Sequence, residues 1–532
     1  YLGGDSCETV HSMVVDEQEN LVVFGVSNSL NYPVLSNAFD TIKDSSRNIS
    51  LSHISAFYPG GTDIIISKFN PSGTALLGST FFGGNETDGL NIDFANPNSS
   101  KLNLLYNYGD HFRGEVITDS LGNVYIGTST YTKNLSTGPD TLGGNQDGIV
   151  AKFSPDLSNL IWSRYVGGSE NDGIYSLKII NGDRVLVGGG TRSYIDFPVS
   201  PGSYSDTAFG GEADGFISII SSNGQTIEKS TFIGNSFYNQ VYFIEFDRFG
   251  GIYAFGQTQG SFPLKNTKIA DSLAGQFIVK LDNNLDSLIY STTFGDGQIS
   301  GAINISPTAF LVDQCQNVYV SGWGGHLRAP TVEGIKFLSN NMPITADAFR
   351  STTSNLDFYL YVMKRDADSV LYASFFGGTS SRDHVDGGTS RFDKRGVIYQ
   401  SVCASCNITA SDFPTTPAAH APVKRTGTGA NCNNALFKFD FEILPRASIF
   451  TSTEVVCAPS FVTIKDSSKN AEELLWDFYG TPSLTQNLDT VIYFDTPGFY
   501  TIRQYARDTI CNTIDSTEII IEVQPSTIAY TP

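Results

Sequence analysis

Short runs of apolar and β-branched residues alternate along most of the chain with clusters of Gly, Asn, Asp and Ser, and the runs return in a fixed order. The clearest copy reads Gly-Asn-Val-Tyr-Ile-Gly at 122–127, Asp-Gly-Ile-Val-Ala-Lys-Phe at 147–153 and Leu-Ile-Trp-Ser-Arg-Tyr-Val at 160–166. Runs of this length, bounded by turn residues, predict β-strands. No stretch keeps a helical period, so helices should be scarce.

The repeating unit has four strands and occurs six times. Its second strand is the easiest to follow, with copies at 21–25, 122–127, 184–188, 251–256, 317–322 and 396–401. One four-stranded unit cannot bury both of its faces alone, and repetition at this spacing is typical of propeller blades. The sequence therefore predicts an all-β chain with a six-bladed β-propeller over residues 1–443.

The two ends of the repeat region suggest how the ring closes. The last unit stops at its third strand, 435–440, whereas Tyr1-Leu2-Gly3-Gly4 reads as the end of a fourth strand and not as a signal peptide. We expect residues 1–4 to complete the final blade, because a closed ring leaves no unpaired sheet edge there.

A second domain is predicted at 446–525, with 526–532 as a tail or the start of a linker. Its strand spacing favours an immunoglobulin-like β-sandwich. Trp-Asp-Phe at 476–478 and Pro-Gly-Phe-Tyr-Thr-Ile at 497–502 resemble the motifs of polycystic-kidney-disease-type (PKD) domains, although Tyr-Gly at 479–480 replaces the family's Gly-Asp-Gly. Trp476 is expected to be the core tryptophan of the sandwich and not a ligand-stacking residue.

The repeats resemble the bacterial β-propeller repeat (SBBP) family, whose units carry Tyr-Leu-Gly-Gly, Gly-Asn-Val-Tyr-Val-Thr-Gly, Asp-Phe-Pro-Thr-Thr-Pro and Ala-Phe-Val-Ala-Lys-Leu. The matching segments here are 1–4, 122–127, 412–417 and 149–153. Such repeats joined to PKD domains are similar to large surface proteins of Bacteroidota that the type IX secretion system exports. The resemblance implies a non-enzymatic secreted or cell-surface module for gliding motility, adhesion or surface assembly, with other surface or secretion-system proteins, or extracellular glycans, as partners.

The net charge of −21 and the isoelectric point near 4.6 argue against a nucleic-acid or anionic-lipid partner, which the chain would repel. Acidity also has a simpler explanation, since it keeps a large surface protein soluble. No run of 18 apolar residues occurs, so no membrane-spanning helix is expected.

Nine tripeptides of the form Asp-Ser/Thr-apolar resemble the O-glycosylation sequon of Bacteroidota, which is used on exported proteins. The alternative is that Asp-Ser and Asp-Thr are favourable turn residues at strand ends. The hydroxyl residues of these tripeptides are Thr41, Ser120, Thr141, Thr207, Ser272, Ser287, Ser369, Thr490 and Thr509.

Seven cysteines in a chain that resembles exported proteins predict disulfides with one thiol left over. Cys457 and Cys511 lie on strands predicted to be neighbours, so they are expected to pair. Cys403, Cys406 and Cys432 cluster in the last unit, where a disulfide would stabilise a long segment that is poor in core residues.

The remaining cysteines leave alternatives open. Cys7 is a candidate partner for the last-unit cluster, and Cys315 has no evident partner. The Cys-x-x-Cys motif at 403–406 could instead begin a zinc site, for which Cys432 and His420 are the nearest additional ligands in sequence.

Two further groups of residues are candidate ligand sites. Loops rich in Asp, Asn and Gly follow the fourth strands and suit Ca²⁺, with Asp88, Asp172, Asp383 and Asp386 as candidate ligands, although plain turns also explain them. The loop at 322–328 carries Trp323, His326 and Arg328, which could stack on and hydrogen-bond a sugar. The alternative for Trp323 is packing between blades.

No catalytic residues are predicted. The chain lacks Gly-x-Ser-x-Gly, His-Glu-x-x-His and a phosphate-binding loop. The alternative is a carbohydrate-binding or polysaccharide-degrading propeller, which assembles its carboxylates from distant blades. Converging carboxylates in an open central cleft would favour that alternative, and a filled central channel would favour the non-enzymatic module.

Overall fold

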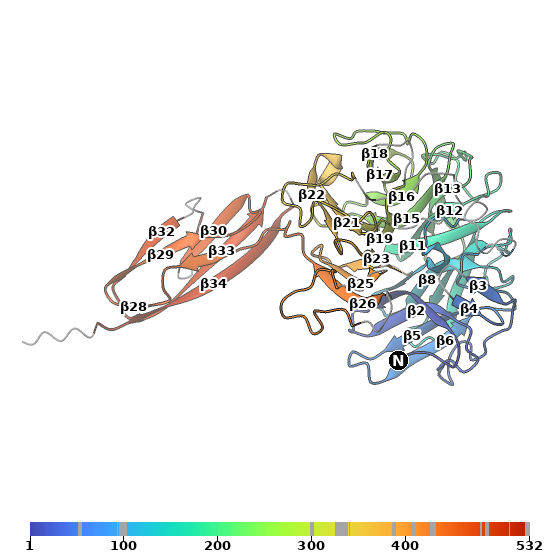
Figure 1. Cartoon of the computed structure of the whole chain (residues 1–532), viewed down its shortest axis with the longest axis horizontal. Helices are drawn as coiled ribbons and strands as arrows, with labels where there is room; N and C mark the ends of the chain where they lie inside the picture. Colours follow the sequence, from blue (N-terminus) through green and yellow to red (C-terminus); the bar gives the residue numbers. More distant parts are fainter. Residues whose placement is uncertain are drawn as a thin grey trace, which may run out of the picture. The chain divides into compact units, whose positions relative to one another are not determined.

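A computed structural model of the chain forms two units (Figure 1). One comprises Tyr1–Val312 and Gln316–Phe439, and the other comprises Asp313–Cys315 and Asp440–Pro532. The residues that the structure describes are 1–51, 56–92, 94, 104–297, 303–324, 339, 341–385, 390–406, 411–425, 432–478, 481–484, 489–509 and 511–526.

The first unit is a six-bladed β-propeller, as predicted, whose blades run from blue to orange in Figure 1. The first three sheets are β1 (Glu8–Val15), β2 (Leu21–Ser27), β5 (Asp63–Phe69) and β6 (Leu76–Phe82); β7 (Glu115–Thr118), β8 (Val124–Thr130), β9 (Asp147–Phe153) and β10 (Leu160–Val166); and β11 (Asp172–Ile180), β12 (Arg184–Thr191), β13 (Asp214–Ile220) and β14 (Ile227–Ile233).

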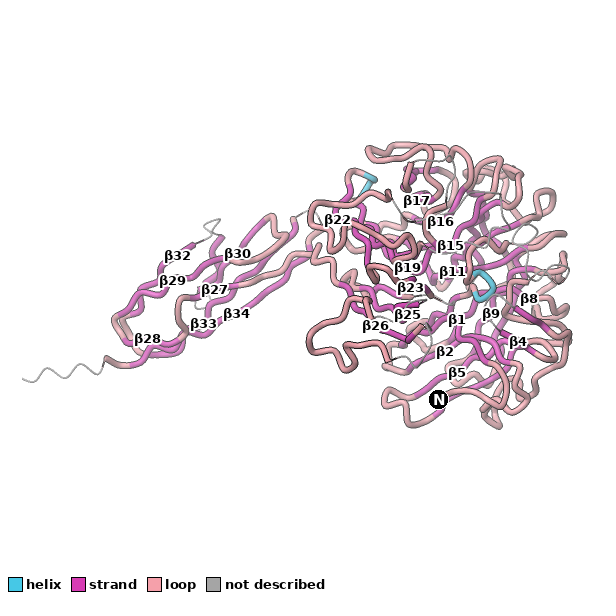
Figure 2. Tube along the Cα trace, viewed as in Figure 1, coloured by secondary structure: helices cyan, strands magenta, loops and turns pink. Residues whose placement is uncertain are grey.

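The other three sheets complete the ring. They are β15 (Asn239–Phe246), β16 (Ile252–Thr258), β17 (Gln276–Leu281) and β18 (Leu288–Phe294); β19 (Ser306–Val312), β20 (Val318–Trp323), β21 (Phe358–Met363) and β22 (Val370–Phe376); and β23 (Arg382–His384), β24 (Arg391–Phe392), β25 (Ile398–Cys406) and β26 (Asn433–Phe439). A small hairpin, β3 (Ile49–Leu51) and β4 (Ala56–Tyr58), lies between β2 and β5. Helical residues in the described chain are confined to two 3₁₀ turns, Asp110–Phe112 and Arg365–Ala367 (Figure 2).

The central strands of the first five blades are almost completely buried because neighbouring blades cover both of their faces, whereas β25 of the sixth blade has exposed positions between buried ones. β13 and β21 are buried at every position, and β8 and β16 are as well. Four first strands also carry a β-bulge, between Val10 and Ser12, Ile174 and Ser176, Val241 and Phe243, and Pro307 and Ala309. A bulge inserts one unpaired residue and redirects its side chain.

The second unit contains two packed sheets, as the sandwich prediction requires. One sheet is β27 (Ile449–Thr451), β29 (Ser460–Asp466) and β32 (Asp489–Phe494); the other is β28 (Val455–Cys457), β34 (Thr513–Gln524), β33 (Gly498–Asp508), β30 (Glu473–Phe478) and β31 (Thr481–Leu484). Trp476 is 2% exposed and belongs to the apolar cluster between the sheets, which confirms it as a core residue.

The ring does not close through residues 1–4, and that prediction is wrong. Leu2 packs against Tyr32, Ile65 and Phe81 of the first blade, and β26 pairs with β25. The physical reason is that the loop after β2 satisfies the amides of the N-terminal segment. The backbone N–H groups of Asp5, Ser6 and Cys7 donate to the side chains of Asn31, Ser29 and Asn28, at 2.8–2.9 Å.

The side chain of Arg391, on β24, joins the last blade to the first two blades. Arg391 of β24 donates to the Met13 carbonyl oxygen at 2.9 Å and to Ser12 Oγ at 3.0 Å, both on β1. It also donates to Glu115 Oε1 at 2.8 Å and to the Val116 carbonyl oxygen at 2.9 Å, both on β7. The ring is therefore closed here by one guanidinium and not by a shared sheet.

Candidate functional site

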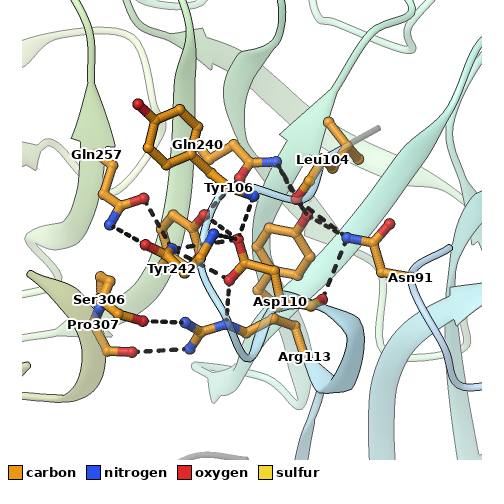
Figure 3. Close-up of polar contacts among 12 residues, drawn as sticks. Asn91, Leu104, Tyr106, Asp110, Arg113, Gln240, Tyr242, Gln257, Ser306 and Pro307 are labelled. Atoms are coloured by element: carbon orange, nitrogen blue, oxygen red, sulfur yellow. Dashed lines mark hydrogen bonds and ion pairs between the residues drawn. The ribbon is translucent and has the colours of Figure 1, made fainter. Parts of the chain in front are cut away.

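The axis of the propeller is filled by part of the segment that connects β6 to β7. We call residues 104–114, the described stretch directly before β7, the plug. Figure 3 shows that side chains from several blades converge on it. Asn107 exchanges two amide hydrogen bonds with Gln257 of β16, at 2.9 and 3.0 Å, and Arg113 donates to the Pro307 carbonyl oxygen of β19 at 3.0 Å. The plug is thus fixed to the fourth and fifth blades.

Asp110 is the centre of the polar network in the plug. Its carboxylate accepts hydrogen bonds from the backbone N–H groups of Tyr106 and Asn107 at 2.8 and 2.6 Å, and from the hydroxyl of Tyr242 at 2.9 Å. Arg113 Nε lies 3.0 Å from Asp110 Oδ1, and both side chains are almost completely buried. A buried carboxylate with this many donors is held in place as a structural group.

The described residues of the network determine its charge. It contains one carboxylate, Asp110, which is paired with Arg113. Burial, with the negative charge of Asp110, raises the pKa of Tyr175 and Tyr242 well above the usual tyrosine value, so both phenols stay neutral. Two carboxylates facing a cleft, the arrangement of a glycosidase, do not occur among these residues.

The sequence reasoning missed the residues that hold the plug. The bulges of β11 and β15 leave Tyr175 and Tyr242 as the unpaired extra residues. Tyr175 donates to the Leu104 carbonyl oxygen at 3.0 Å, and Tyr242 donates to Asp110. A bulge has no clear signature in a single strand, because the extra residue becomes evident only when the partner strand's register is known.

A cavity of about 590 Å³ lies on the face of the propeller formed by the loops after the second and fourth strands. We call it the rim cavity. A volume of this size is in the usual range for small-molecule sites. Its lining residues are Arg47, Asn85, Glu86, Ile92, Phe94, Tyr131, Lys133, Asn134, Leu142, Gly144, Asn145 and Asn171.

An aromatic pair and an ion pair give the rim cavity a fixed wall. The rings of Phe94 and Tyr131 meet edge to face, with centroids 4.8 Å apart. The guanidinium of Arg47 lies over the Phe94 ring at 4.2 Å and forms an ion pair with Glu86 at 3.2 Å. The Tyr131 hydroxyl donates to Gln146 Oε1 at 2.9 Å, which fixes the tyrosine from the interior.

Asp88 organises the loop that carries Tyr131 and Lys133. Its carboxylate accepts hydrogen bonds from the Thr130 hydroxyl, from the Thr132 hydroxyl at 2.8 Å and from the Gly84 N–H at 3.0 Å. Asp88 is fully buried, so this candidate calcium ligand is occupied by protein donors. The same residue connects the junction between the first two blades to the rim cavity.

Asp88 belongs to a repeating pair of buried carboxylates at the blade junctions. A Cβ placed on Gly83 would lie 3.0 Å from Asp63 Oδ1 and 2.8 Å from Asp88 Oδ2. We call the pairs Asp63/Asp88, Asp147/Asp172 and Asp357/Asp383 the junction carboxylates, since a glycine separates each pair in the same way. Burial raises the pKa of Asp63 to about 8, with the charge of Asp88 adding to the shift, and burial raises the pKa of Asp88 to about 7.

Two other candidate calcium ligands also accept hydrogen bonds from protein groups. Asp172 accepts from the Gly168 N–H at 2.8 Å and from Ser193 Oγ at 2.7 Å, and Asp383 accepts from the Ser405 N–H at 2.7 Å. Asp386 lies outside the described residues. In the described chain, three side chains of metal-ligating type meet at two places, and each place contains a disulfide instead of a junction carboxylate.

Trp323 is 5% exposed, which places it in the core and not at a sugar-binding surface. Its ring lies 6.2 Å from that of Tyr108 in the plug and 5.7 Å from that of His384 in the sixth blade, centroid to centroid. The ring therefore packs between blades. His326 and Arg328, the other members of this candidate site, lie outside the described residues.

The cysteines pair differently from the prediction. Cys511 is bonded to Cys315, with a Cα–Cα distance of 4.7 Å, so the predicted Cys457–Cys511 bridge is wrong. The reason is the register of β34. Cys511 lies in the turn before this strand, whereas Cys457 is opposite Gln524 at the strand's other end, about 35 Å away.

The second disulfide lies in the last-unit cluster and joins Cys406 to Cys432. Cys7, Cys403 and Cys457 form no disulfide in the described part of the chain. His384, and not His420, approaches the cluster, with its Nδ1 atom 3.6 Å from Cys406 Sγ. A zinc site would need Cys406 and Cys432 as thiolates, and the disulfide takes both sulfurs.

The nine predicted glycosylation residues lie at the surface. Seven are exposed, while Ser369 and Thr490 are half-buried. Several of the preceding aspartates also cap a turn, since Asp40, Asp119 and Asp271 each accept from the N–H group two residues ahead, at 2.9–3.1 Å. Turn formation and glycosylation are compatible, and sugar attachment stays a prediction.

No family model and no curated protein matches the chain. Among solved structures, it is similar to the extracellular domain of a one-component system from B. thetaiotaomicron, with 11% identity over 97% of this chain and 61% of that one and a TM-score of 0.26. A PL25 ulvan lyase shows 11% identity over 82% and 96%, with a TM-score of 0.33. The NanB sialidase of Streptococcus pneumoniae shows 8% identity over 76% and 66%, with a TM-score of 0.36.

The chain spans about three fifths of that extracellular domain. Similarities with such low sequence identities and TM-scores do not indicate an activity. In the described part of this chain, no helix combines the length and the apolar character that crossing a bilayer requires.

Proposed function

We propose that the chain is a non-enzymatic module of the cell surface or the extracellular space that serves adhesion, motility or surface assembly. The observation that carries the proposal is the filled axis. In a glycosidase built on a propeller, two carboxylates must flank an open cleft. Here the plug occupies that position, and its one carboxylate is neutralised by Arg113.

Two disulfides support the extracellular part of the proposal, because such bonds persist in oxidising compartments. The exposed Asp-Ser/Thr-apolar tripeptides are accessible to a glycosylation system. The finer assignment, an SBBP and PKD protein exported by the type IX system and linked to gliding, rests on the sequence motifs described above.

A second candidate function is glycan binding, which the rim cavity favours. Its lining combines an aromatic pair with four asparagines and two cations. Such a combination of apolar surface and hydrogen-bonding groups suits a sugar ring. Glycan binding without cleavage is compatible with an adhesion module, so the second candidate adds a ligand to the first and does not replace it.

Turnover distinguishes the module from an enzyme. The purified chain should release no new reducing ends and no unsaturated products from a panel of neutral, uronate-containing and sulfated polysaccharides during long incubation. Product formation that is lost in Glu86→Gln, at the rim cavity, or in Asp110→Asn, at the plug, would overturn the proposal. A catalytically competent lyase or sialidase serves as the positive control for detection.

A further inference from the structure

The rim cavity contains polar side chains that the protein itself does not use. Asn85, Asn134 and Asn145 make no side-chain hydrogen bond within the described part of the chain, and Lys133 makes no ion pair there. An amide side chain provides a donor and an acceptor together, which matches a sugar hydroxyl. By contrast, Asn28 and Asn31 in a nearby loop are both engaged by backbone N–H groups.

Among the residues that the structure describes, one cation of the cavity, Lys133, forms no ion pair. Arg47, Glu86 and Lys133 are its charged lining residues, and Arg47 is paired with Glu86. The ammonium group of Lys133 is therefore available to an anion. In a chain with a net charge of −21, an anionic ligand is repelled by most of the surface and attracted at this point.

The wall of the cavity provides apolar contact area beside these polar groups. Ile92 and Leu142 line the cavity and are buried, and the rings of Phe94 and Tyr131 meet edge to face beside them. Because the Tyr131 hydroxyl already donates to the buried Gln146, little freedom of this ring is lost when a ligand binds. The C–H face of a pyranose ring matches such a surface.

We propose that the rim cavity binds a hexuronic acid residue of an acidic polysaccharide. The carboxylate of the sugar pairs with Lys133, its hydroxyls bond with Asn85, Asn134 and Asn145, and its C–H face lies on the aromatic wall. This inference rests on the proposed adhesion function and names the ligand class of that function. It involves no bond cleavage.

Isothermal titration calorimetry on the full chain tests the inference, with trigalacturonate as the probe and maltotriose as its neutral counterpart. Trigalacturonate should bind and maltotriose should bind at least tenfold more weakly. Lys133→Gln should weaken trigalacturonate binding about tenfold, since it removes one charge-assisted contact. Asn145→Ala should weaken it severalfold. Raising the salt concentration should lower the affinity of the original chain.

Lys394→Gln is the matched control, because Lys394 is an exposed lysine in the turn before β25 without an ion pair in the described chain. It should bind trigalacturonate as the original chain does. Equal binding of both trisaccharides, no binding of trigalacturonate, or an equal loss in Lys394→Gln and Lys133→Gln would each overturn the inference. Binding with cleavage would leave the ligand class standing and overturn the non-enzymatic function instead.

Discussion

Glu115 and Asp63 are both carboxylates on propeller strands and are 2% and 1% exposed, yet their pKa values are shifted in opposite directions. Burial alone raises the pKa of each. At Glu115, the charges of Lys178 and Arg391, with a hydrogen bond from Ser176, reverse this effect and bring the pKa to about 2. At Asp63, the neighbouring charge belongs to Asp88, and the pKa rises to about 8.

The comparison shows that the partner, and not the degree of burial, decides the sign. Glu115 lies in the charged hub, which we define as Glu115, Lys178, Glu245 and Arg391. Lys178 Nζ is 3.2 Å from Glu115 Oε1 and 3.0 Å from Glu245 Oε1. The hub thus joins the second, third, fourth and sixth blades through opposite charges, whereas the junction carboxylates place like charges between neighbouring blades.

The two regions therefore respond to pH in opposite senses. The folded-state pKa of Glu115 lies below the unfolded value near 4.3, so its contribution to stability is present above that value and is lost as the pH falls towards 2. The folded-state pKa of Asp63 lies above the unfolded value near 3.9. Its contribution is present at low pH and is lost as the pH rises towards 8.

Arg391→Met should have the largest effect, because it leaves Glu115 buried with Lys178 as its only strong cation and removes the closure to β1. We expect a loss of about 3 kcal/mol in the free energy of unfolding at pH 7, measured by guanidinium denaturation. Arg395→Met, at an exposed ion pair in the same blade, is the control and should be unchanged. A loss in Arg391→Met no larger than in the control would show that the hub does not hold the ring.

Asn239→Asp creates a pair of buried carboxylates at a blade junction that has only one. There Asp214 faces Asn239, whose Nδ2 donates to the carbonyl oxygens of Asn235 and Phe237 at 2.8 and 2.9 Å. An ionised aspartate at this position cannot donate either hydrogen bond. The free energy of unfolding should therefore fall by about 2 kcal/mol at pH 8, and by less at pH 5, where the new carboxyl group keeps its proton. Asn223→Asp, in an exposed turn, should be neutral; an equal loss at both pH values would contradict the electrostatic explanation.

Asp63→Asn replaces one of the two carboxylates at the first junction with an amide, so that the junction resembles the Asp214/Asn239 junction. The variant keeps an oxygen that accepts from the Asp44 N–H, and it removes the group whose pKa is about 8. Thermal unfolding between pH 5 and 8 should therefore show a smaller loss of stability with rising pH than in the original chain. An unchanged slope would mean that Asp63 is ionised throughout this range.

Calcium should have the smallest effect. The oxygens of Asp88 already accept hydrogen bonds from Gly84, Thr130 and Thr132, so a Ca²⁺ ion would have to displace protein donors. Millimolar Ca²⁺ should change the free energy of unfolding by less than about 0.5 kcal/mol. A larger stabilisation that disappears in Asp88→Asn, but not in Asn223→Asp, would restore the calcium site predicted from the loop sequences.

Local sequence patterns were sufficient to predict the blades, but not the plug. Each blade strand is a short run with its own turn signals, and the run at 147–153 corresponds to β9. The plug has no repeat partner and no regular strand. Its role depends on Tyr175 and Tyr242, which reach it only because bulges redirect them.

The rim cavity was also beyond the sequence, because its lining comes from separate loops. Arg47, Phe94 and Lys133 lie in three different segments, and only the ring places them around one space. No periodicity connects them, so a reading along the chain treats each as an ordinary loop residue. Asp88 and Asp172 were predicted to be calcium ligands, because the sequence does not show which protein groups donate hydrogen bonds to them.

The sequence by itself determined the all-β class, the six four-stranded units and the second sandwich with its core tryptophan, because these follow from short-range alternation and turn residues. Tertiary structure alone decided the disulfide partners, the closure of the ring, the filled axis and the sign of each buried carboxylate's pKa shift. Those properties depend on which residues meet across blades, and distances between blades are set by strand register and bulges rather than by spacing along the chain.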